Sequence, residues 1–130
     1  MTNSEFVFVY STFPDEAAAR RVGEALVTQK LAACVNIYPP MHSIYEWEGK
    51  LESGAEISAF IKTRRAHVDA VIAAARPLHP YTVPCFLVLP IEGGNDDYLA
   101  WARAQTQVES MASANELTPT LPQGDGVNSR

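Results

Sequence analysis

The sequence has little basic charge and little cysteine. Its 130 residues carry 10 Lys and Arg against 15 Asp and Glu, which gives a formal net charge of -5. A nucleic-acid-binding domain concentrates Lys and Arg on one face, so this class of function is not expected. The two cysteines, Cys34 and Cys85, are too few for a disulfide framework, and we expect both to be free thiols.

Long apolar runs and familiar catalytic motifs are also lacking. The apolar run at 6–10 has five residues, whereas a membrane-spanning helix needs about 20. The first twenty residues show no signal-peptide pattern, and we therefore expect a cytoplasmic protein. The sequence contains no Gly-x-Ser-x-Gly elbow, no Gly-x-x-x-x-Gly-Lys phosphate loop and no Cys-x-x-Cys pair. These absences predict that the protein is not an enzyme.

The sequence does contain a regular succession of strand and helix patterns. β-forming residues predict strands at 5–10, 33–38, 55–62 and 84–90, with 43–48 also extended. The first strand is apolar throughout, which favours burial on both faces. Apolar residues at helical spacing predict helices over 14–30 and 64–76, the second ended by Pro77, and a short helix after Asp96. Proline at both ends of 84–90 favours an edge strand.

This β-α-β-β-α-β order with a C-terminal helix predicts an α+β domain of the ferredoxin-like arrangement over residues 1–106. Such a domain has a four-stranded antiparallel sheet with both helices on one face. Residues 107–130 are polar and rich in proline and glycine, and they are predicted to form a tail. The second sheet face has no helix to cover its large side chains, which are Tyr38, Tyr45, Trp47 and Phe60. An exposed apolar face is typical of an interface, so we expect an oligomer.

Five segments carry a family resemblance: Lys30-Leu-Ala-Ala-Cys-Val-Asn-Ile37, Ser43-Ile-Tyr-Glu-Trp-Glu-Gly-Lys50, Ile61-Lys-Thr63, His79-Pro-Tyr81 and Leu89-Pro90. In this unbroken order the chain resembles the CutA family, named for divalent-cation tolerance, over about residues 5–106. The resemblance implies a ferredoxin-like subunit in a homotrimer similar to the PII signalling proteins, with the sheets facing one another around a three-fold axis. It also implies a response to divalent metal ions, with copper the favoured ion, and it implies no catalysed reaction.

His79 and Cys85 are the predicted metal ligands. Imidazole and thiolate together favour soft or borderline ions such as copper or zinc. Many family members resemble His-Pro-Tyr-Glu-x-Pro-Glu here, whereas this chain has Thr82 and Cys85 at the two acidic positions. That departure removes ligands for a hard cation and keeps those for a soft one. Two alternatives stay open: His79 forms a turn at a helix end or subunit contact, and Cys85 is a small buried apolar residue.

The remaining candidate residues have mainly structural interpretations. Cys34 is predicted to pack in the interior, His42 to be exposed or at a subunit contact, and His67 to lie on the surface. Charged residues at a hairpin tip prevent edge-to-edge association, which is the role predicted for Glu46, Glu48, Glu52 and Glu56. The alternative function is a PII-like signalling or scaffold trimer that binds a small anionic effector or a partner protein between subunits. Lys62 and Arg64 would then bind the anion.

Overall fold

The computed structural model describes residues 4–107, so the predicted tail lies outside the described residues from 108 onward. Within the described part, helices and strands follow the predicted order. Single 3-10 turns, η1 and η2, flank the second helix. The elements are β1 (Phe6–Phe13), α1 (Glu16–Thr28), β2 (Cys34–Ile37), β3 (Met41–Trp47), β4 (Lys50–Arg64), η1 (Arg65–His67), α2 (Val68–Ala75), η2 (Arg76–Leu78), β5 (Leu87–Ile91) and α3 (Asp96–Gln105).

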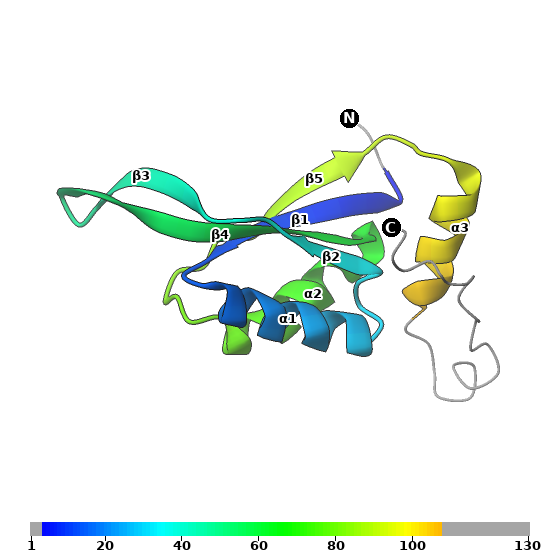
Figure 1. Cartoon of the computed structure of the whole chain (residues 1–130). Coiled ribbons are helices and arrows are strands. Elements are labelled where there is room, and N and C mark those ends of the chain that lie inside the picture. Colours follow the sequence, from blue (N-terminus) through cyan, green and yellow to red (C-terminus); the bar gives the residue numbers. More distant parts are fainter. Residues whose placement is uncertain (1–3, 108–130) are drawn as a thin grey trace.

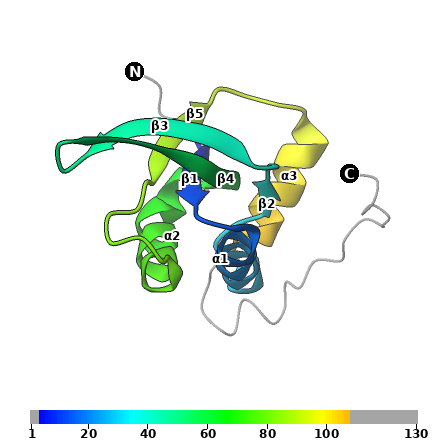
Figure 2. The same ribbon diagram turned by 60° about the vertical axis from the view of Figure 1, so that its left-hand side comes forward.

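The strands form an antiparallel sheet in the order β2-β4-β1-β5. β3 pairs with the first half of β4, and this hairpin extends beyond the rest of the sheet as an arm (Figure 1). α1 and α2 lie side by side against one sheet face, while α3 lies at the end of the sheet opposite the arm (Figures 1 and 2). The predicted mixed α+β fold with an antiparallel sheet is confirmed.

β1 is fully buried only on the face that α1 and α2 cover. Val7, Val9 and Phe13 face the helices and are buried, whereas Phe8 and Tyr10 alternate with them and are half-buried. The prediction of burial on both faces was therefore wrong for this chain. A strand buried on both faces needs a complete second layer, whereas α3 lies only beside the end of β1 that holds Phe6 and Phe8.

The helix predicted from residue 14 begins instead at Glu16, after a side-chain cap. Asp15 has extended backbone and accepts a hydrogen bond from the Ala18 N–H at 2.8 Å. Pro14 therefore precedes the cap and does not lie in the first turn. The inner face of α1 buries Val22 and Leu26 in the core. Gly23 lets the helix approach β2, since a Cβ there would lie 3.3 Å from Val35.

The uncovered face of the sheet carries a cluster of aromatic rings. Phe60 lies at its centre, with ring-centroid distances of 5.6 Å to Phe8, 5.3 Å to Tyr10 and 5.6 Å to Tyr38. The arm also has exposed apolar side chains, and the exposed fraction of Leu51 is 80%. Several large apolar side chains are therefore exposed on this face and along the arm.

Two predicted boundaries differ from the structure for physical reasons. The α-helix predicted over 64–76 ends at Ala75, and Pro77 lies in the 3-10 turn η2 that follows, where its missing N–H has no helical partner. β4 starts at Lys50 instead of residue 55, because a tight turn aligns it with β3. Glu48 and Gly49 in that turn have φ of 52° and 82°, the left-handed pair typical of a two-residue hairpin. The edge position predicted for the last strand is confirmed by the place of β5 beside β1.

Candidate functional site

His79 is a buried side chain at the point where η2 ends. Only 7% of its surface is exposed. Its ring stacks on Phe13 at a centroid distance of 4.6 Å and meets the edge of Phe86 at 5.7 Å. The imidazole therefore lies at the boundary between the helical layer and the loop that leads to β5.

Both ring nitrogens of His79 contact the backbone. Nε2 lies 2.9 Å from the Thr12 carbonyl oxygen, which can only accept, and Nδ1 lies 3.2 Å from the Tyr81 N–H, which can only donate. These partners fix the tautomer: Nε2 carries the proton and Nδ1 carries the lone pair. Burial lowers the pKa of His79, although the Thr12 carbonyl and the Glu56 charge oppose the shift. The ring is consequently neutral near pH 7.

Glu56 links this loop to the base of the arm. Its Oε2 accepts a hydrogen bond from the Tyr81 hydroxyl at 2.7 Å, and its Oε1 accepts one from the Ser43 hydroxyl at 2.7 Å. Burial and the bond to Glu56 together raise the pKa of Tyr81. The carboxylate thus joins β3, β4 and the 79–86 loop. Sequence reasoning grouped Glu56 with the hairpin tip, but it pairs with Met41 at the base, so that placement was wrong.

Cys85 lies just before β5 as a half-buried free thiol. Burial raises its pKa, and the negative charge of Glu56 raises it further. The thiol is therefore protonated at neutral pH. Within residues 4–107 no group of three or more His, Cys, Asp or Glu side chains has the arrangement of a metal site. The negative charge of one carboxylate, Glu56, acts on both the His79 imidazole and the Cys85 thiol.

The other predicted candidates take no part in this hydrogen-bond network. Cys34 is half-buried at the start of β2, opposite Lys62 on β4. His42 is exposed on β3, opposite Ala55. The remaining acidic residues of the arm, Glu46, Glu48 and Glu52, are exposed near its tip as predicted.

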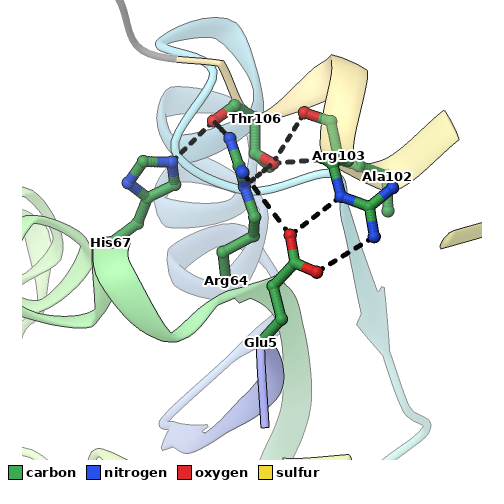
Figure 3. Close-up of polar contacts among 6 residues, drawn as sticks. All are labelled: Glu5, Arg64, His67, Ala102, Arg103 and Thr106. Atoms are coloured by element: carbon green, nitrogen blue, oxygen red, sulfur yellow. Dashed lines mark hydrogen bonds and ion pairs between the residues drawn. The ribbon is translucent and has the colours of Figure 1, made fainter. Parts of the chain in front are cut away.

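A second polar network fixes the end of α3 to the sheet (Figure 3). The Thr106 hydroxyl accepts a hydrogen bond from Arg64 Nε at 3.0 Å. The Thr106 carbonyl oxygen accepts two more, from Arg64 Nη2 at 3.0 Å and from His67 Nε2 at 2.6 Å. Arg103 makes two further bonds to Glu5, at 2.8 and 2.9 Å, which lower the pKa of that carboxyl. His67 was predicted to be a surface residue, and its role here had no signal in the sequence.

Comparison with known proteins places the chain in a family. Residues 7–105 match the profile described as CutA1 divalent ion tolerance protein. The chain belongs to this family. The resemblance seen in the sequence motifs is thereby confirmed. No helix between residues 4 and 107 is both long and apolar enough to cross a membrane.

Individual CutA relatives agree in sequence and structure. The chain is 43% identical over 98 residues to the divalent-cation tolerance protein CutA of Pectobacterium atrosepticum, covering 75% of this chain and 89% of that protein. It is 43% identical over 101 residues to the chloroplastic CutA 1 of Oryza sativa, covering 78% of this chain but 57% of the rice protein. The structure of CutA1 from a psychrotrophic Shewanella species superposes with a TM-score of 0.79 at 35% identity, over 82% of this chain and 99% of that one. For CutA1 of Thermus thermophilus the TM-score is 0.75 at 42% identity, over 78% and 98% of the two chains.

Proposed function

We propose that this protein takes part in tolerance to divalent metal ions by weakly binding copper, or another soft or borderline ion such as zinc, through His79 and Cys85. Membership of the CutA1 family supports the general role, since the relatives are named for divalent-cation tolerance. The observation that carries the site assignment is the tautomer of His79. The ion is the cargo of the protein in this proposal, and no catalysed reaction is part of it.

The hydrogen bonds of His79 suit a metal ligand. A ligating histidine generally donates its other ring N–H to a carbonyl or carboxylate oxygen, which fixes the ring and raises its basicity. Nε2–H of His79 already donates to the Thr12 carbonyl at 2.9 Å. Nδ1 holds the lone pair, which accepts the longer 3.2 Å hydrogen bond from the Tyr81 N–H. An ion at Nδ1 would displace that single bond and leave the anchor on Thr12 intact.

The same site argues for weak binding. Structural zinc sites use four protein ligands and catalytic ones use three, whereas His79 and Cys85 supply two. The Cys85 thiol must also lose its proton, and burial together with Glu56 makes that loss harder. Soft ions compete best for a thiolate, which favours copper. We therefore expect an exchangeable ion.

The experiment is a titration with Cu(I) against a competing chelator, using wild type, His79→Ala and Cys85→Ser. Each substitution is expected to weaken binding by at least about tenfold. Affinity should also fall as the pH is lowered, because protons compete for the imidazole and thiol. His42→Ala is the matched control, since His42 is exposed on the arm and should leave affinity unchanged. Equal affinities for wild type and both site variants would sink the assignment.

We further propose that the protein is a cytoplasmic homotrimer of ferredoxin-like, PII-like subunits. The strand order β2-β4-β1-β5 and the two helices on one face support the subunit assignment. The aromatic face around Phe60 and the exposed apolar side chains of the arm, Ile44 and Leu51, support burial against other copies. Light scattering should return the mass of three chains; the mass of one chain would contradict the assembly. Cell fractionation tests the location.

A further inference from the structure

A small cleft separates α3 from the neighbouring end of the sheet, far from His79. Its volume is about 160 Å³. The walls come from three parts of the chain: Phe6 and Phe8 of β1, Lys62 of β4, and Tyr98 and Leu99 of α3. Gly93 and Gly94, in the turn before α3, also line it, together with two hydroxyl-bearing residues, Thr63 and Thr106. Apart from Lys62 and these two threonines, the side chains named here are apolar or aromatic, so the cleft combines a largely hydrocarbon wall with one positive charge.

Lys62 lacks a counter-ion within the described part of the chain. Its Nζ lies 5.8 Å from the ring centroid of Phe8 and 5.6 Å from that of Tyr98. No described carboxylate lies within 4.0 Å of it, whereas Arg64 and Arg103 at the same end of the sheet both reach Glu5. An ammonium group that is half-buried among aromatic rings has lost part of its hydration, and an anion beside it would replace that hydration.

We propose that this cleft binds a small carboxylate with an aromatic or short aliphatic body. The carboxylate would pair with Lys62, and the hydrocarbon would lie against Phe8, Tyr98 and Leu99. The volume sets the size of the ligand, because an apolar cavity of about 150 Å³ is known to accept benzene. Nucleotides and other large effectors need pockets of about 300 Å³ or more, which excludes them here. This binding site is independent of the metal site proposed at His79 and Cys85.

The test is an NMR titration of the assembled full-length protein with benzoate, and with benzyl alcohol as a neutral analogue of similar shape. Benzoate should produce saturable shifts of the Gly93 and Gly94 amides. Lys62→Met should weaken benzoate binding about tenfold, the loss expected for one charge-assisted hydrogen bond, and should leave benzyl alcohol binding unchanged. Lys62→Arg keeps the charge and should retain most of the affinity. Lys50→Met, at the exposed arm, is the matched control for removal of a lysine charge.

Three outcomes would overturn the proposal. The first is the absence of saturable shifts at Gly93 and Gly94, which would also follow if a side chain of a neighbouring copy filled the cleft. The second is equal weakening of benzoate binding by Lys62→Met and Lys50→Met, which would indicate a general charge effect. The third is unchanged benzoate affinity in Lys62→Met, which would show that Lys62 does not bind the carboxylate. None of these outcomes bears on metal binding at His79.

Discussion

Replacing Thr106 with valine tests how strongly the network at the end of α3 stabilises the fold. Thr106 is fully buried, and its hydroxyl donates to the Ala102 carbonyl at 2.7 Å and accepts from Arg64 Nε at 3.0 Å. The Thr106 N–H bonds to Arg103 instead of Ala102, so the hydroxyl caps a carbonyl at the helix end. Valine keeps the shape and removes both bonds. Each of the two groups left without a partner costs about 1–3 kcal/mol, so we expect a loss of about 2–6 kcal/mol.

The assay is unfolding in guanidinium chloride at one fixed protein concentration, because assembly would otherwise change the apparent stability. Thr28→Val is the control: Thr28 is exposed at the last residue of α1, and the change should stay within about 0.5 kcal/mol. Thr106→Ser keeps the hydroxyl and should recover most of the loss. If Thr106→Val unfolds at the same denaturant concentration as Thr28→Val, the network does not contribute as argued.

Two further predictions concern the cluster around His79. Burial lowers the pKa of His79 below the 6.5 of the unfolded chain, so the unfolded state binds the proton more readily. The contribution of His79 to the free energy of unfolding is complete above pH 6.5 and is lost as the pH falls through the folded pKa. Urea unfolding measured from pH 7 to 5 should show this decline in stability. His79→Gln should make the stability less dependent on pH in this range. An unchanged slope in that variant would refute the argument. Tyr81→Phe removes a hydrogen bond to a carboxylate and should cost about 1–2 kcal/mol by the same measurement, whereas Tyr38→Phe, on the exposed aromatic face, should cost little. Equal losses for the two tyrosines would rule out this role for the Tyr81 hydroxyl.

The order of the helices and strands was predictable because the local sequence patterns favour the same elements that the folded sheet and its helices require. Apolar residues recur at helical spacing in α1 and α2, and β-forming residues run through β1, β2 and β4. Each of these segments is long enough to bury one face. The first part of β4 was missed because Ser53 and Gly54 have little strand propensity. Pairing with β3 imposes the strand there, with Ser43 opposite Gly54. The start of β4 is therefore set by its pairing with β3 and not by the strand propensity of its own residues.

The candidate site was only partly predictable for a related reason. His79 and Cys85 are six positions apart, and their residue types together with the family resemblance suggested a soft-metal site. Glu56 belongs to the same cluster only because the arm register places it at the base, where the Tyr81 hydroxyl reaches it. Neither the register nor that long-range contact has a local signature in the sequence. The tautomer of His79 likewise depends on Thr12, which is 67 positions away.

Glu56 acts on the proposed ligands in two opposing ways. Its negative charge would favour any cation nearby, but the same charge raises the pKa of Cys85 and opposes the lowering at His79, so it also favours protons. Each of its oxygens already accepts a hydrogen bond from a hydroxyl, which leaves it poorly placed as one of the several oxygen ligands that calcium or magnesium needs. Thr82 and Cys85 carry no carboxylate, so none comes from those two positions. An ion that binds here must therefore compete with a proton for sulfur, and soft ions such as copper do this best.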